Sequence, residues 1–216
     1  MDAQNSISRI NWWATQTIQN FQEQVSSSYS NRVFPTFPAL RHNRTASVLV
    51  KWSHPTLGLM KLNVDGSAKG NPGFSGGGGI CRKEDGSFIF AFSAGYGYGT
   101  NNSAELRAIY DGLELCLLKG INRIMVELDS KLVIAILVGE SRCPWHWKPW
   151  LDRINNLRLS GTFTFHHILY EGNGPADSLV KVGSETQVKK CHDHFTSLPR
   201  QTKGLVFLDK VGLGSI

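Results

Sequence analysis

The chain has 216 residues, enough for one sizeable hydrophobic core with flanks, and 41% of them are hydrophobic and 19% charged, as in ordinary globular proteins. No run approaches the roughly 18 consecutive apolar residues that a membrane-spanning helix needs, so we expect no membrane partner. The net charge is +6, but residues 48–180 hold 13 Lys and Arg against 12 Asp and Glu, so most of the excess lies in the flanks. Global charge is therefore weak evidence for a polyanionic partner.

The cysteines and the N-terminus bear on the compartment. The four cysteines are far apart, with no CxxC pair and no zinc-ligand spacing, which favours reduced thiols. The first 30 residues are rich in Gln, Asn and Ser and contain no apolar signal-peptide core. We therefore expect an intracellular protein, nuclear or cytoplasmic and not secreted.

The chain divides by composition into three parts. Residues 1–47 are expected to be a poorly structured flank, with at most a helix over residues 10–25, because Ser-rich and Pro-containing stretches interrupt the apolar pattern. Residues 48–186 contain nearly all of the periodic apolar pattern and are predicted to form the domain. Residues 187–216 are assigned to a tail with a few apolar positions; whether either flank folds is left open.

The first half of the domain predicts three strands. Apolar and polar residues alternate over residues 59–65, and a cluster of Gly and Pro then forces a turn. Residues 78–82 and 88–94 are two further apolar runs, separated by a stretch that includes Asp85-Gly86, a dipeptide typical of hairpins. The three strands are expected to form an antiparallel meander.

The second half alternates helices with strands. Helices are predicted over residues 104–119, 131–138 and 173–182, and a further helix that ends at residue 159 follows a Trp-rich connection. Strands are predicted over residues 124–128 and 162–170. Strands that alternate with helices require parallel crossover connections. The predicted fold class is therefore α/β, with a mixed five-stranded sheet, three antiparallel strands followed by parallel crossovers, and helices on both faces.

Four carboxylates stand at element ends that this architecture brings to one edge of the sheet. They are Asp65, Glu105, Asp129 and Asp177. Asp129 or Asp177 taken alone is better explained as a helix cap or a charge favoured in the first turn of a helix. Four together repel one another unless they hold cations, and an all-oxygen site suits Mg²⁺ or Mn²⁺. Two such ions can activate water for phosphodiester cleavage.

Four motifs then resemble, in the same order, the signature of type 1 ribonuclease H. They are Asp65-Gly66-Ser67 with its Gly70-Asn71-Pro72-Gly73 turn, Thr100 to Leu106, Glu127 to Ser130, and Glu171 to Asp177. The overall pattern most resembles the plant ribonuclease-H-like, reverse-transcriptase-like domain of proteins related to non-LTR retrotransposons. The resemblance covers about residues 48–185.

The resemblance implies a ribonuclease H-like fold and a metal-dependent endonuclease that hydrolyses the RNA strand of RNA–DNA hybrids by a two-metal mechanism. Asp65 would bridge two Mg²⁺ ions, or Mn²⁺ in their place, while Asp177 would complete one site and Glu105 and Asp129 the other. Three asparagines match positions that contact the hybrid, although turn and cap chemistry would also explain them: Asn71, Asn101 and Asn102. We expect a monomer without a small-molecule organic cofactor.

Two departures from the family pattern leave alternatives open. His166 and His167 fall inside the last predicted strand rather than in a histidine loop, and Tyr170 stands where related proteins usually have arginine. One alternative is a catalytically weak module that binds hybrids and derives from a retrotransposon polyprotein; another is a structural remnant of such a polyprotein. Retention of four acids favours the enzyme, because a pure binder has no use for a negative cluster that repels phosphate.

Overall fold

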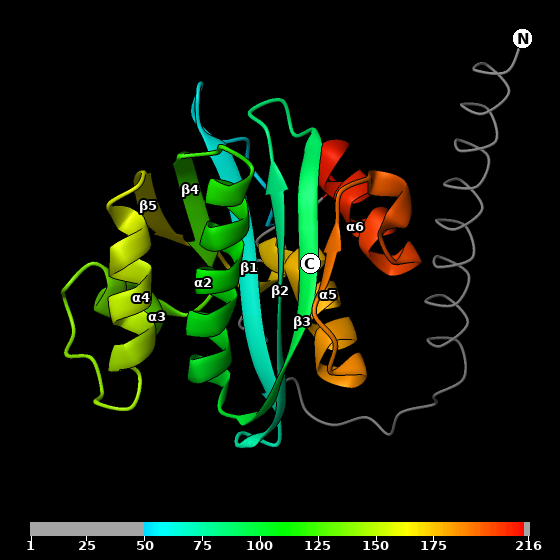
Figure 1. Ribbon diagram of the computed structural model, residues 1–216. Helices are drawn as coiled ribbons and strands as arrows, with labels where there is room; N and C mark the ends of the chain where they lie inside the picture. Colours follow the sequence, from blue (N-terminus) through cyan, green and yellow to red (C-terminus); the bar gives the residue numbers. More distant parts are fainter. Residues whose placement is uncertain (1–49, 214–216) are drawn as a thin grey trace, which may run out of the picture. The chain divides into compact units, whose positions relative to one another are not determined.

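The computed structural model describes residues 50–213, and the expected N-terminal flank over residues 1–47 lies outside them. A six-stranded mixed sheet forms the centre of this part, with strand order β5-β4-β1-β2-β3-β6 (Figure 1). The strands are β1 (Met60–Lys69), β2 (Gly73–Arg82), β3 (Phe88–Gly99), β4 (Arg123–Leu128), β5 (Thr162–His167) and β6 (Lys190–His192). β1, the first strand of the described part, thus lies in the middle of the sheet.

The pairing of the strands confirms the predicted meander and crossovers. β1, β2 and β3 pair in antiparallel fashion, whereas β1 pairs with β4, and β4 with β5, in parallel. The prediction of five strands was wrong by one, because β6 adds an antiparallel strand at the edge of β3. This strand was missed because three residues are too short to show an alternating pattern.

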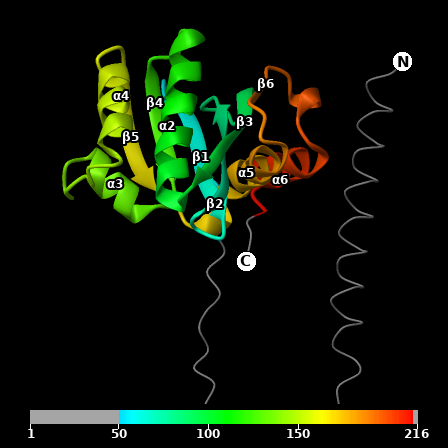
Figure 2. The same ribbon diagram turned by 60° about the horizontal axis from the view of Figure 1, so that its bottom comes forward.

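Helices cover both faces of the sheet, as predicted. They are α2 (Asn101–Leu118), α3 (Lys131–Leu137), α4 (Lys148–Arg158), α5 (Gly174–Thr186) and α6 (Arg200–Lys210), with short 3-10 turns at η1 (Tyr170–Asn173) and η2 (Phe195–Ser197). Figure 2 shows α2 and α4 together on one side of the sheet, and α5 and α6 on the other. Within residues 50–213, no helix combines the length and apolarity needed to cross a membrane.

Each face of the sheet has its own hydrophobic core. On the α2 side, Leu62 and Val64 of β1 are fully buried among apolar residues of α2, β3 and β4. On the other side, a smaller cluster joins Ile80 of β2 to Leu179 of α5 and Val206 of α6. The alternation along β1 thus directs its even-numbered side chains to the larger core and its odd-numbered ones toward α5.

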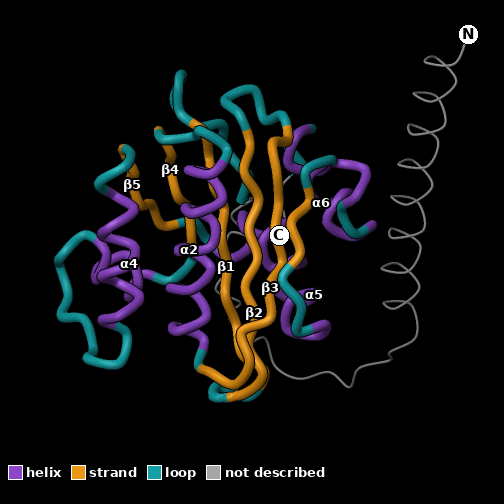
Figure 3. Tube along the Cα trace, in the orientation of Figure 1, coloured by secondary structure: helices purple, strands orange, loops and turns teal. Residues whose placement is uncertain are grey.

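The segment assigned to a tail folds onto the domain as far as the structure describes it. β6, η2 and α6 follow α5 in the chain, and α6 packs against α5 (Figure 3). Helix α6 buries only Thr202 and Val206 among its own residues. Its apolar side is narrow, which explains why the sequence alone gave so weak a signal for it.

Candidate active site

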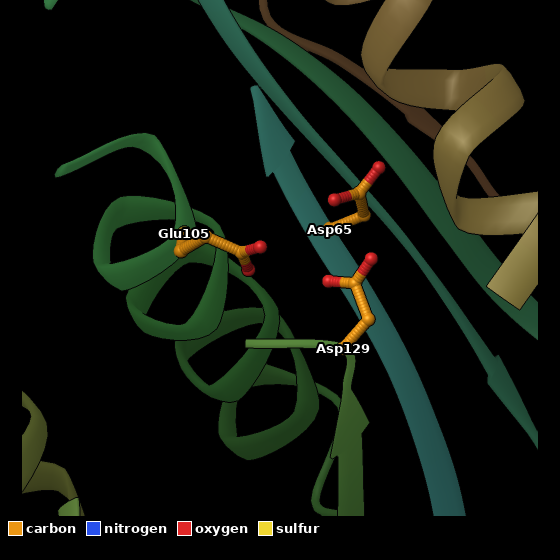
Figure 4. A group of neighbouring side chains, drawn as sticks. All are labelled: Asp65, Glu105 and Asp129. Atoms are coloured by element: carbon orange, nitrogen blue, oxygen red, sulfur yellow. The ribbon is translucent and has the colours of Figure 1, made fainter. Parts of the chain in front are cut away.

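Three of the four predicted acids meet at one end of β1. One carboxylate oxygen from each of Asp65, Glu105 and Asp129 lies within 4.8 Å of the other two. Figure 4 shows the three side chains converging from β1, from α2 and from the loop after β4. Asp65 and Glu105 are buried, and Asp129 is partly exposed, so the cluster opens to solvent on the side of Asp129.

The parallel pairing of β1 with β4 explains why Asp65 and Asp129 are neighbours. Asn63 of β1 lies opposite Glu127 of β4. Asp65 comes two residues after Asn63 and Asp129 two residues after Glu127, so the two aspartates lie at the same level of the sheet. Asp129 comes directly after β4 ends at Leu128, at the carboxyl end of the strand. A register slip of one residue would move Asp65 to the opposite face of the sheet.

Glu105 reaches the cluster because α2 packs directly on the backbone of β1. An ideal Cβ atom at position 66 would lie 2.3 Å from the backbone nitrogen of Glu105, so only glycine fits there. Helix α2 begins at Asn101, three residues earlier than predicted, since Thr100 is the N-cap and forms a capping box with Ser103. The cap and the glycine together fix where Glu105 stands.

Burial and mutual repulsion disfavour the charged forms of these acids. The pKa of Asp65 is raised from its ordinary value of 3.8 to about 7, first by burial and then by the charges of Asp129 and Asp177. Burial and the charges of Asp65 and Asp129 hold the pKa of Glu105 well above its usual range. The Oε2 atom of Glu105 is buried and has no hydrogen-bond partner among the described residues. A bound cation would therefore offset the repulsion between these carboxylates and stabilise their charged forms.

The residues present fit a divalent metal ion. All the donor atoms are carboxylate oxygens, which hard cations such as Mg²⁺ prefer, and one of them is an unpartnered buried oxygen. Metal binding would require deprotonated carboxylates, so it would release protons from Asp65 and Glu105.

Asp177 lies near the trio but is engaged elsewhere. It stands in the first turn of α5, and its charge contributes to the raised pKa of Asp65. Its Oδ2 atom accepts a hydrogen bond from the ammonium of Lys181 at 2.6 Å, one helical turn later in α5. The structure therefore brings Asp177 to the rim of the site without joining it to the trio.

Two of the three predicted substrate-contacting asparagines also hold the local backbone together. The Oδ1 atom of Asn101 accepts a hydrogen bond from the backbone of Ala68 at 2.8 Å, and that of Asn71 accepts one from the backbone of Asn101 at 2.9 Å. These bonds tie the β1–β2 turn to the start of α2. Asn102 is half-buried and makes no side-chain hydrogen bond within residues 50–213.

Sequence reasoning missed the role of Asn173. This buried residue precedes α5, and its Nδ2 atom donates to the backbone oxygen of Val64 at 2.8 Å. The bond fixes the start of α5 next to Asp65, and the only signal in the sequence was the position of Asn173 within the fourth motif. His166 and His167 lie in β5, as predicted, but the strand ends at His167 rather than at Tyr170, and a ring nitrogen of His167 lies 3.1 Å from the backbone oxygen of Asp129.

Comparisons with known sequences match this part of the chain. The sequence model of the family described as reverse transcriptase-like matches residues 63–183. A provisionally named ribonuclease H protein of Arabidopsis thaliana is 34% identical over 137 residues, which are 61% of this chain and 22% of that protein. A ribonuclease H of Cyanothece sp. is 26% identical over 153 residues, which cover 97% of it. The chain thus spans about a fifth of the Arabidopsis relative and nearly all of the cyanobacterial one.

Solved structures match the fold. RNase H1 of the archaeon Halobacterium salinarum NRC-1 superimposes with a TM-score of 0.57 at 26% identity, over 60% of this chain and 99% of that one. LC11-RNase H1, solved in complex with an RNA/DNA hybrid, gives a TM-score of 0.55 at 29% identity, over 59% and 97% of the two chains. The two solved structures thus share their fold with about three fifths of this chain.

Proposed function

Because the chain belongs to the reverse transcriptase-like family, we propose that it is a metal-dependent endonuclease that hydrolyses the RNA strand of RNA–DNA hybrids. The observation that carries the proposal is the meeting of Asp65, Glu105 and Asp129, the acids of the first three motifs, within 4.8 Å of one another. The complex of LC11-RNase H1 with an RNA/DNA hybrid supports the choice of substrate class.

The acids of this chain would hold two Mg²⁺ ions, or Mn²⁺ in their place. Asp65 would contribute to both sites, Glu105 and Asp129 to one, and Asp177 to the other. Bound there, the ions would supply an activated water and stabilise the leaving oxygen of the cleaved phosphodiester. Asp177 forms an ion pair with Lys181, so this ion pair would have to open before Asp177 could bind a metal ion.

The asparagines near the start of α2 would bind the hybrid. Asn71 and Asn101 use their amide oxygens inside the protein, and each amide carries two N–H donors on an exposed residue. Asn102 is half-buried beside them. Such donors can contact phosphate oxygens and 2′-hydroxyl groups, and the latter distinguish RNA from DNA.

A second candidate is the hybrid-binding module with weak catalysis. The ion pair between Lys181 and Asp177 favours this second candidate, because the carboxylate of the fourth acid is already bound to an ammonium group. Tyr170 stands where related proteins have arginine. The pKa of its phenol is raised, mainly by burial and secondly by the nearby negative charge of Asp177.

Cleavage of an end-labelled RNA–DNA hybrid in Mg²⁺ and in Mn²⁺ distinguishes the two candidates. Duplex DNA and duplex RNA serve as substrate controls. Asp65→Asn tests the cluster, and Asp152→Asn, at an exposed acid of α4 paired with Lys148, is the matched control. Metal-dependent cleavage of the RNA strand that Asp65→Asn abolishes and Asp152→Asn retains would establish the enzyme. Binding without cleavage in either metal would leave the binding module.

A further inference from the structure

Helix α6 lies outside the part of the chain that the family shares. The family match ends at residue 183, whereas α6 spans residues 200–210. It packs against α5, on the face of the sheet opposite α2 and α4 (Figure 2). Two polar side chains of α6, Asp209 and Thr202, contact residues that are connected to the acids of the candidate active site.

The first contact is an ion pair between Asp209 of α6 and Arg82 of β2. The Oδ2 atom of Asp209 accepts from the Nη1 atom of Arg82 at 2.6 Å, and the arginine side chain is only 1% exposed. The guanidinium lies over the ring of Trp52, 3.8 Å from its centroid. Its Nη2 atom donates to the Oδ1 atom of Asn63 at 2.8 Å.

The contacts of Asn63 continue across the sheet to β4. Because its Oδ1 atom also accepts from the indole of Trp52 at 2.9 Å, the amide has one orientation, with Nδ2 donating to Glu127 at 3.0 Å. Glu127 in turn pairs with the ammonium of Lys61 at 2.5 Å. The network thus joins β1 to β4 by side chains located two residues before Asp65 and two residues before Asp129.

The second contact joins α6 to α5. The hydroxyl groups of Thr202 and Ser178 are 2.7 Å apart, and both residues are buried. Ser178 directly follows Asp177 and also donates to the backbone oxygen of Pro175 at 2.8 Å, in the first turn of α5. Thr202 therefore contacts the turn that holds the fourth acid.

We propose that α6 positions the metal-binding acids, with Asp209 acting on Asp65 and Asp129 through Arg82, and Thr202 acting on Asp177 through Ser178. Without Asp209 the buried guanidinium would be drawn to Glu127, whose charge already acts on it, and β4 would shift relative to β1. Misplacement of metal ligands by a fraction of an ångström weakens a site strongly. The consequence for catalysis rests on the proposed function, whereas the consequence for metal binding does not.

The test compares three variants of the full chain. Asp209→Asn removes the negative charge of the ion pair with Arg82, and Thr202→Val removes the hydroxyl that contacts Ser178. Both variants nearly keep the shape of the side chain. Val206→Ala, in the apolar contact of α6, is the matched control that loosens the helix and keeps both polar contacts. Mn²⁺ affinity is measured by titration calorimetry without nucleic acid, at a temperature at which circular dichroism shows each variant folded. Cleavage of the hybrid is measured alongside as kcat and KM.

We expect Asp209→Asn to weaken Mn²⁺ binding roughly tenfold and to lower kcat with little change in KM, as loss of a positioning contact does in metal sites. Thr202→Val should weaken binding in the same direction, and Val206→Ala should leave it within about twofold of wild type despite a lower melting temperature. A merely structural α6 would lower the melting temperature in all three variants and leave Mn²⁺ affinity unchanged.

Each outcome decides the inference. Wild-type Mn²⁺ affinity in folded Asp209→Asn and Thr202→Val would overturn it, as would an equal loss in Val206→Ala. If Asp209→Asn does not fold, Thr202→Val measured against Val206→Ala decides alone. Weakened Mn²⁺ binding in a protein whose wild type cleaves no hybrid would refute the proposed function and uphold the positioning role. Failure of the wild type to bind Mn²⁺ would overturn both.

Discussion

Asp65→Asn should stabilise the metal-free protein, and more strongly as the pH rises. In the folded protein the pKa of Asp65 is raised from 3.8 to about 7, so the carboxyl group stays protonated up to near neutrality while the unfolded chain ionises near pH 4. The unfolded state thus binds fewer protons over this range, and the stability of the wild type falls as the pH rises toward 7. The amide of asparagine does not titrate and is free of this loss.

The size of the effect follows from the shift. A difference of about 3 pKa units corresponds to about 4 kcal/mol at full ionisation, of which about 2 kcal/mol has already been lost at pH 5. The stability difference between Asp65→Asn and wild type should therefore grow by about 2 kcal/mol between pH 5 and pH 8. Because Glu105 and Asp129 share the repulsion, this figure is an upper bound.

Urea unfolding in EDTA at several pH values measures the difference, and a second series in Mg²⁺ completes the assay. Mg²⁺ should stabilise the wild type and leave Asp65→Asn nearly unchanged, since only the wild type retains the shared ligand. Asp152→Asn should follow the wild type throughout, because its carboxylate pairs with Lys148 at the surface. A difference between Asp65→Asn and wild type that is constant with pH, or that shrinks toward pH 8, would refute the electrostatic account of the cluster.

Three further variants probe the framework of the site. Gly66→Ala introduces a methyl group 2.3 Å from the backbone nitrogen of Glu105, so hybrid cleavage should fall by about tenfold or more, and full activity would contradict the close contact of α2 with β1. Lys61→Met leaves Glu127 buried without its cation, and urea unfolding should show a loss of about 3–5 kcal/mol; a loss below about 1 kcal/mol would mean that water replaces the ammonium. Asn102→Ala should raise KM for the hybrid with kcat and stability unchanged, and an unaltered KM would remove it from the binding surface.

The sequence predicted the parts of the site that depend on strand and helix ends. The alternation along β1, the glycine turn after it and the helix-start residues before Glu105 each have a local physical cause, and together they fix where the acids lie. The separation of Asp177 from the trio was not predicted: the i,i+4 spacing allows its ion pair with Lys181, but the spacing does not say whether Asp177 faces the lysine or the other acids.

The charged interior of the sheet could not be predicted from local patterns. Lys61 and Arg82 are each 1% exposed, although their residue types are almost always solvated, and each is buried only because a distant acid pairs with it. Asp209 is such an acid, and it lies in a helix whose apolar side is too narrow to stand out. For Asn71 and Asn101, the structure shows the hydrogen bonds to the backbone that turn and cap chemistry predicts. Their contact with the substrate stays a prediction.

The ion pair between Arg82 and Asp209 also bears on how the chain folds while it is being made. The two residues are 127 positions apart, so at typical elongation rates of about 5–20 residues per second Asp209 is added about 6–25 s after Arg82. Until then the guanidinium lacks its paired carboxylate, and its hydrogen bond to Asn63 alone does not offset its removal from water, so we expect that face of β2 to stay hydrated. We therefore expect the sheet to close on the α5 side only after α6 has left the ribosome, so that nascent chains lacking this helix remain open to chaperones and proteases.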